Sequence, residues 1–215
     1  MNFSNLWQYL PDFIGGLGVS VVVTLVGMTV GSVAGLGVYA VARSSRRLVA
    51  LVGQSYIELI RNTPLLVQLY LLYFGLPSIG VDLSALWATL VGLSANTAAY
   101  MAEVFRAGFA STPTGQREAA AVLGMTRAQA FRYVLLKPAI KRVMPAMDNQ
   151  LVLLFLFSSI AALLSLNELM NVTLNVGLAT ALRVETLILG GVLYYATAAL
   201  FSWSMRFIDR RVLAW

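Results

Sequence analysis

The side chains that most often carry out chemistry in proteins are rare in this sequence. There is no histidine and no cysteine, which removes the commonest general base, the commonest metal ligand and every thiolate. The nine acidic residues are scattered singly, so a metal site built only from carboxylates is not expected. A proteolytic or group-transfer centre needs a nucleophile beside a base, or a pair of carboxylates. We therefore expect no catalytic residue, no metal and no cofactor in this chain.

Two glutamate–arginine pairs lie inside otherwise apolar stretches. Glu58 and Arg61 are three residues apart, and Glu103 and Arg106 repeat that spacing, which places each pair on one face of a helix. Ionisable groups inside a membrane are expensive and usually face the interior of a helix bundle. Each pair either lines a path or gate, or is a structural pair whose arginine extends to the lipid headgroups. We favour the structural interpretation, because both pairs lie near one end of an apolar stretch.

Uncharged polar residues accompany these pairs. Pro64, which follows Asn62 and Thr63, is expected to kink its helix and to free carbonyl groups that Asn62 or Thr63 can satisfy. Gln68 and Asn96 lie deeper in their apolar stretches. They either line a path or bond to a neighbouring helix.

A polar and basic stretch at residues 111–143 has a helical pattern of its own. Strong helix formers near its start predict a short helix, and Gly124 is expected to turn the chain. Thr126 and Gln129 form a capping-box pattern that starts a second helix, and Pro138 is expected to end or kink it. Two short helices at a glycine make a compact knob that fits a groove of another protein. The alternative is an amphipathic hairpin lying on lipid headgroups.

The elements that carry these residues are long and apolar. Hydrophobic residues make up 59% of the chain and charged residues only 11%, against about a quarter in soluble domains. A helix needs about 20 mostly apolar residues to cross a bilayer. We predict an all-α integral membrane protein, a single transmembrane domain over residues 1–215, with five spans at about 18–42, 51–76, 86–109, 144–166 and 186–208.

Glycines in the first span recur every four residues. Gly27, Gly31 and Gly35 therefore share one helix face, and such faces let two helices approach closely in lipid. We predict a packing groove against another span, rather than mere tolerance of glycine in lipid.

The basic residues orient the spans. They gather after the first span, in residues 111–143 and at the end of the chain, whereas the opposite side holds only Arg183. By the positive-inside rule the N-terminus is outside, the C-terminus is cytoplasmic and residues 111–143 face the cytoplasm. The net charge of +6 is thus explained by topology, and no nucleic-acid partner is expected. An external stretch at 167–184 has a helical period and is interpreted as a short interfacial helix.

Four segments in order resemble the permease subunits of bacterial ABC importers, in the polar amino acid family of histidine, glutamine and glutamate permeases. Residues 116–126 (QREAAAVLGMT) resemble the EAA motif, and 58–68 (ELIRNTPLLVQ) resemble the family segment E-x-x-R-G-T-P-L-L-V-Q. Residues 99–108 (AYMAEVFRAG) resemble the third-span signature, and Asn149 with Glu168 and Leu169 occupy family positions. The resemblance covers about residues 19–211.

The resemblance implies the type I ABC importer permease fold in the bacterial inner membrane. It implies two cytoplasmic ATPase subunits, a second permease chain, and an extracytoplasmic binding protein. The chain has no phosphate-binding loop motif, so ATP and Mg²⁺ are expected on the ATPase. The coupling helix that docks on the ATPase would comprise Gln116, Glu118, Ala119, Ala120, Leu123, Gly124 and Met125.

The fourth span departs from this family. Relatives commonly carry Lys-Asp-Thr-Ser-Leu where this chain has residues 156–160 (LFSSI), and Gln150 stands where a glutamate is common. The lost lysine and aspartate would suit the two charges of an amino acid. Either this is the non-binding half of a heterodimer with a similar sister permease, which we prefer, or the solute is not a typical zwitterionic amino acid. The candidate path residues are Glu58, Arg61, Asn62, Thr63, Gln68, Asn96, Glu103, Asn149, Gln150, Ser158 and Ser159.

The sequence therefore predicts a permease subunit of an ATP-driven ABC importer for polar amino acids or related small polar solutes. The alternatives are a permease half for another solute, a secondary transporter, a membrane scaffold and a membrane enzyme. A secondary transporter would predict inverted repeats, which five spans and a coupling-type loop do not fit.

Overall fold

The computed structural model describes residues 4–110 and 113–212, and within these residues the chain is helical with no strand. Nine α-helices are described: α1 (Leu10–Ala42), α2 (Arg47–Arg61), α3 (Leu65–Tyr70), α4 (Ala85–Ala110), α5 (Thr114–Val122), α6 (Arg127–Gln129), α7 (Leu136–Phe157), α8 (Leu169–Thr180) and α9 (Arg183–Val212). Short 3-10 segments occupy Ser4–Tyr9, Leu76–Ile79 and Ser158–Leu164, and π-helical segments occupy Leu71–Gly75 and Ala130–Leu135.

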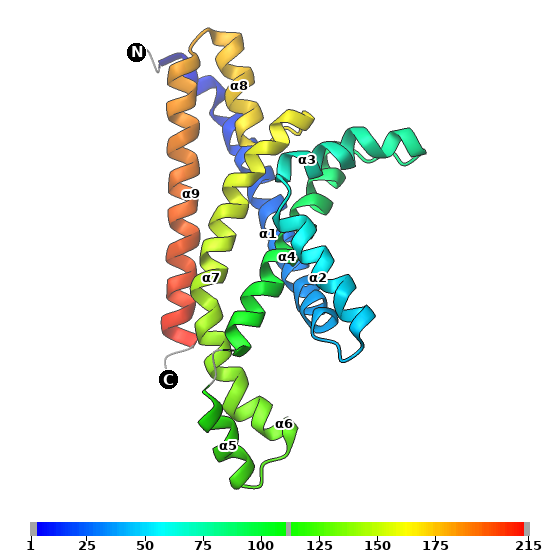
Figure 1. The fold of residues 1–215 in the computed structure, drawn as a ribbon. Helices are drawn as coiled ribbons and strands as arrows, with labels where there is room; N and C mark the ends of the chain where they lie inside the picture. The colour runs from blue at the N-terminus through cyan, green and yellow to red at the C-terminus, as the bar shows by residue number, and fades with distance from the viewer. Residues whose placement is uncertain (1–3, 111–112, 213–215) are drawn as a thin grey trace.

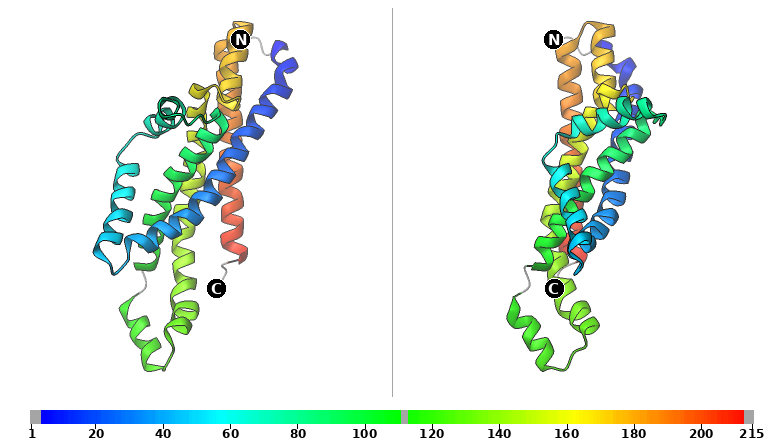
Figure 2. Two further views of the ribbon diagram at one scale, coloured as in Figure 1. Left: turned by 90° about the vertical axis from the view of Figure 1, so that its right-hand side faces the viewer. Right: turned by 45° about the vertical axis from the view of Figure 1, so that its right-hand side comes forward.

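The long helices form an elongated bundle from which α5 and α6 project. Figure 1 shows α7 and α9 side by side, with α1 and α4 crossing beside them. The two ends of the chain lie at opposite ends of the bundle, as an odd number of crossings requires. The projecting pair lies beyond the end nearest the C-terminus in every view (Figures 1 and 2).

Three helical stretches in the described part are long and apolar enough to cross a membrane: Asn5–Ala42, Pro138–Leu164 and Arg183–Arg211. They correspond to the first, fourth and fifth predicted spans. Helix α4, at the third predicted span, is 26 residues long but carries the buried polar residues Thr89, Asn96 and Thr97. The count of five spans and their orientation stay predictions.

The glycine face of α1 packs on α4, as the four-residue repeat predicted. A Cβ atom on Gly27 would lie 3.3 Å from the Cβ of Leu93. On Gly31 it would lie 2.5 Å from the Cβ of Thr97, and on Gly35 it would lie 2.8 Å from the backbone oxygen of Ala98. Contacts this short leave no room for a side chain, so the prediction of a packing groove is confirmed.

The second predicted span is not one helix. Helix α2 ends at Arg61, and Pro64 has an extended backbone (φ −61°, ψ 136°) before α3 begins at Leu65. This is a full break where a kink was expected, because a proline disfavours helical backbone in the residue before it. The apolar stretch then continues through π and 3-10 turns to Ile79.

Polar side chains satisfy the backbone at this break. The Thr63 hydroxyl donates to the carbonyl of Leu59 at 2.8 Å. Gln68 Nε2 lies 2.9 Å from the carbonyl oxygen of Ile60 and 2.9 Å from Thr63 Oγ1, and donates to both. The sequence suggested Asn62 or Thr63 for this role, whereas the structure assigns it to Thr63 and Gln68.

Pro138 does not end the helix that begins after Thr126, because helical segments follow one another without a break from Arg127 to Phe157, and the expected kink stays a prediction. Helix α7 runs from Leu136 through both Pro138 and Pro145 to Phe157. Pro138 is the third residue of α7, which follows directly on the π segment Ala130–Leu135. The chain enters through a π turn, in which the amide of Leu136 donates to the carbonyl of Phe131.

Helix α8 is the short helix predicted between the last two spans, and its place at the membrane interface stays a prediction. It packs against α1 and α9 and runs beside the end of α9 nearest the N-terminus (Figure 1). Its apolar residues Leu169, Val172 and Val176 are buried with Leu6 and Phe13.

Candidate functional site

The first candidate site is the projecting pair of helices. Helix α5 ends at a glycine turn in which Gly124 has a positive φ of 69°. The amide of Gly124 donates to the carbonyl of Ala121, and the amide of Met125 donates to that of Ala120, both at 3.0 Å. These two bonds define a Schellman motif, which glycine forms without strain. The predicted turn at Gly124 is therefore confirmed.

The second helix of the pair begins with a capping box. The amide of Thr126 donates to Gln129 Oε1 at 2.9 Å, and the amide of Gln129 donates back to Thr126 Oγ1 at 3.3 Å. This reciprocal pattern satisfies two amides that a helix start leaves open. The predicted capping box is confirmed, and it fixes the direction in which the chain leaves the turn.

The tip of the pair is apolar and exposed. Val122 and Leu123 are 87% and 74% exposed, although apolar side chains of this size usually find cover. Gln116, Glu118 and Ala119 are also exposed, whereas Ala120 is buried and Met125 is half-buried. Val122 was not among the predicted coupling residues. The sequence feature that could have singled out Val122 is a large apolar residue at the end of an alanine-rich polar helix.

The second candidate site is a charged cluster between α2 and α4. Nε and Nη2 of Arg106 donate to the carboxylate of Glu103 at 2.8–3.1 Å, so this predicted pair is formed. Glu58 and Arg61 are not paired. Arg61 reaches across instead, with Nη1 3.8 Å from Glu103 Oε2 and its guanidinium 5.3 Å from the Tyr100 ring. Contact with another helix has replaced the pair within α2.

Glu58 lies in a pocket beside this cluster. The pocket has a volume of about 350 Å³ and opens between α1, α2 and α4. Arg43, Arg61, Glu103 and Arg106 contribute to its wall together with Glu58. Within the described parts of the chain Glu58 forms no ion pair.

The remaining predicted path residues do not form one cluster. Asn96 on α4 and Gln150 on α7 are buried, and Asn96 Oδ1 has no hydrogen-bond partner among the described residues. The hydroxyls of Ser158 and Ser159 donate to carbonyls of their own helical turns at 2.7 and 2.6 Å. Asn149 is exposed, as is Asn62 at the break after α2.

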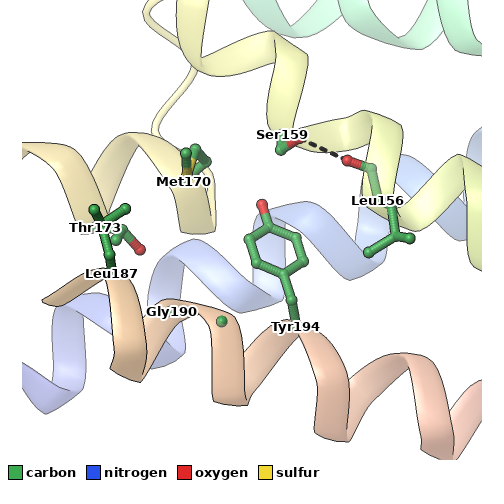
Figure 3. A pocket seen from close by; sticks show the side chains of 8 residues that line it. Leu156, Ser159, Met170, Thr173, Leu187, Gly190 and Tyr194 are labelled. Atoms are coloured by element: carbon green, nitrogen blue, oxygen red, sulfur yellow. Dashed lines mark hydrogen bonds between the residues drawn. The ribbon is translucent and has the colours of Figure 1, made fainter. Parts of the chain in front are cut away.

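Ser159 lines a third candidate site, a pocket of about 370 Å³ at the end of α7 (Figure 3). Ser159 and Leu156 form one side, Met170 and Thr173 of α8 another, and α9 supplies the floor. In Figure 3 the ring of Tyr194 stands up from α9 with its hydroxyl pointing between Met170 and Ser159. The residues of α9 that line the pocket are Leu187, Gly190, Gly191 and Tyr194.

A buried carboxylate, that of Glu168, is bonded to the hydroxyl of Tyr194 in the pocket wall. Glu168 is fully buried and accepts hydrogen bonds from Ser20 of α1 at 3.0 Å and from the Tyr194 hydroxyl at 2.8 Å. It also accepts from the amide of Asn171 at 2.8 Å and so caps α8. One side chain thus ties α1, α8 and α9 together. The sequence placed Glu168 in the external stretch and at a family position but did not predict this role, because Ser20 lies 148 residues away.

The fold and these sites define a helical protein of the membrane, with a projecting helical pair and polar groups buried among its apolar helices. The sequence matches the family of binding-protein-dependent transport system inner membrane components over residues 27–214, and the chain belongs to that family.

Individual relatives agree. The chain is 31% identical to the arginine transport system permease protein ArtQ of Bacillus subtilis, over 99% of this chain and 97% of that protein. It is 32% identical to the octopine transport system permease protein OccM of Rhizobium meliloti, over 97% of this chain and 86% of that protein.

Solved structures show the same fold. A chain in the crystal structure of an amino acid ABC transporter with histidines superposes with a TM-score of 0.93 at 36% identity, covering 98% of this chain and 99% of that one. The inward facing MetNI methionine ABC transporter gives 0.74 at 22% identity, covering 95% of this chain and 98% of that one. The resemblance to ABC importer permeases is confirmed, and the chain is a multi-pass inner-membrane protein.

Proposed function

We propose that this chain is the permease subunit of an ATP-driven importer for polar amino acids or related small polar solutes. The observation that carries the proposal is the projecting pair α5 and α6, an exposed apolar tip held by a glycine turn and a capping box. A compact tip with exposed apolar side chains and a fixed backbone turn is suited to bind in a groove of another protein. In the proposed importer that protein is a cytoplasmic ATPase, present in two copies, which binds ATP and Mg²⁺.

The solute class rests on the relatives. Their names describe transport of arginine, octopine and nopaline. We extend to this chain only the class of polar amino acids and related solutes. An extracytoplasmic binding protein would deliver the solute to the outer face.

The path itself requires a second permease chain in this proposal. The pocket beside Ser159 offers only the hydroxyls of Ser159, Thr173 and Tyr194 as polar groups among its lining residues. Leu156 stands in that lining where relatives commonly carry a charge. A zwitterionic solute would find no counter-charge on this wall, so we place the charged groups on a different but similar sister permease.

The coupling role is tested by a double substitution in the assembled importer. Glu118→Arg reverses a charge on the exposed face of α5. Gly124→Pro removes an amide that donates to Ala121 and forbids the positive φ. We expect ATP-driven uptake in proteoliposomes to fall to background while the chain still inserts in the membrane. Gly115→Ala is the matched control, because Gly115 has open space around it and an ordinary backbone.

Wild-type uptake in the double variant would refute the coupling role. Uptake that needs an ion gradient and not ATP would instead indicate a secondary transporter. The sister chain is tested by expressing two differently tagged copies of this permease with the ATPase. Recovery of both tags in one active importer would refute the heterodimer.

A further inference from the structure

A pocket of about 340 Å³ opens between α2, α4 and α7 on the side of Glu103 away from α1. Three arginines contribute to its wall, one from each helix: Arg61, Arg106 and Arg142. The lining contains a single carboxylate, that of Glu103. The formal charge around the pocket is therefore positive.

The carboxylate is already used. It accepts all three of its described hydrogen bonds from Arg106. Arg61 Nη1 lies 3.8 Å from Glu103 Oε2, which is beyond hydrogen-bond distance, and the guanidinium of Arg61 donates no hydrogen bond to the described residues. A guanidinium has five donors in a planar fork. Those of Arg61 are presented beside a pocket that Arg142 also lines.

The accessible arginines are suited to an anion. The side chain of Arg61 is 41% exposed and Arg142 is also an exposed residue, so a ligand can reach both. Three guanidinium groups and one carboxylate leave an excess of positive formal charge in the lining, which favours a bound anion. Phosphate and its esters match the fork geometry, because two oxygens can accept parallel hydrogen bonds.

The rest of the wall indicates where the phosphate comes from. Val104, Ala107, Gly108 and Ala146 are apolar or small, and Tyr100 adds an aromatic ring. The pocket lies toward the end of α4, in a protein of the inner membrane, at an end where most of the other basic residues gather. Basic pockets between membrane helices bind the headgroups of anionic lipids.

We propose that the pocket between α2, α4 and α7 binds the phosphate of an anionic phospholipid headgroup, through Arg61 and Arg142. This goes beyond the proposed transport function and does not depend on which solute is carried. Glu103 and Arg106 hold the shape of the site, and the apolar wall contacts the glycerol and the start of the acyl chains.

The test is lipid binding by the assembled importer. The complex is delipidated, placed in nanodiscs of phosphatidylcholine with a small fraction of phosphatidylglycerol, and the retained lipid is measured by native mass spectrometry. We expect the Arg61→Gln/Arg142→Gln variant to retain roughly tenfold less phosphatidylglycerol than wild type. The control is Arg46→Gln/Arg47→Gln, which removes two exposed basic residues at the start of α2 without touching the pocket.

Further arms separate the possible sources of the anion. Arg61→Lys/Arg142→Lys keeps the charge and loses the fork, so partial recovery supports the site. Equal losses in the pocket and control variants would mean general surface attraction and would overturn the proposal. Displacement of the lipid by millimolar inorganic phosphate would show a free-ion site. Failure of phosphatidylglycerol to bind the assembled wild-type complex would show that the pocket takes no lipid there, and either result refutes the proposal.

Discussion

The groove between α1 and α4 gives the sharpest quantitative prediction. A Cβ atom at Gly31 would lie 2.5 Å from Thr97 Cβ, 2.7 Å from Thr97 Cγ2 and 2.8 Å from the backbone oxygen of Ser94. All three atoms are stiff, because two belong to a β-branched side chain and one to the helix backbone. Gly31→Ala therefore forces the helices apart rather than moving a flexible side chain.

The magnitude follows from two opposing effects. Overpacking a tight contact costs about 1–3 kcal/mol. Replacing glycine by alanine inside a helix gains about 1 kcal/mol. Gly37 lies in the same helix, and a Cβ atom there would have nothing within 4 Å. Gly37→Ala should therefore gain helix stability without any packing clash. The two variants should differ by the packing cost alone, about 1–3 kcal/mol.

Thermal unfolding of the purified complex in one detergent measures this difference. We expect Gly37→Ala to match or exceed wild type and Gly31→Ala to unfold several degrees lower. Adding Thr97→Gly to Gly31→Ala removes the two nearest atoms and should recover part of the loss, with the Ser94 oxygen limiting the rest. Equal stability of the two alanine variants would refute the close approach of α1 and α4.

Three further variants test other contacts, each against wild type by the same unfolding measurement. Gln68→Leu removes the amide group that donates to the Ile60 carbonyl at the break after α2, and should lower the free energy of unfolding by about 1–3 kcal/mol. Unchanged stability would mean that water or lipid headgroups bond to this carbonyl instead. Tyr194→Phe removes one hydrogen bond to the buried Glu168 carboxylate and should cost about 1.5–3 kcal/mol, and an unchanged midpoint would show that the bond is not formed. Thr126→Val deletes the cap of α6 and should cost about 1 kcal/mol, with faster proteolysis at the projecting pair; wild-type proteolysis would contradict it.

The parts of the structure that could be predicted have local causes. Gly124 and the box of Thr126 and Gln129 act through atoms a few residues apart, so their spacing is enough. The glycine face of α1 is a periodic pattern, and it indicates close packing although it does not name α4 as the partner. The apolar stretches predict membrane helices because length and apolar composition are properties of one continuous segment.

The parts that could not be predicted depend on contacts far apart in the chain. Arg61 has Glu58 one turn away, yet it lies closer to Glu103 on α4 because the two helices pack together. Glu168 looks like an external acidic residue until Ser20 and Tyr194 are brought beside it. At Pro64 the sequence indicates a disturbance, but it does not show that Gln68, four residues later, satisfies the Ile60 carbonyl that the break exposes.

The uninterrupted course of α7 has a mechanical consequence. A helix of 22 residues is about 33 Å long, and α7 keeps its helical course through Pro145, although the proline ring removes one hydrogen bond of the helix. It is joined directly to the π turn at one end and to the pocket of Leu156 and Ser159 at the other. In the proposed importer, a displacement of the projecting pair would therefore be passed to α7. The opposite end of that helix lies at the pocket that Tyr194 also lines.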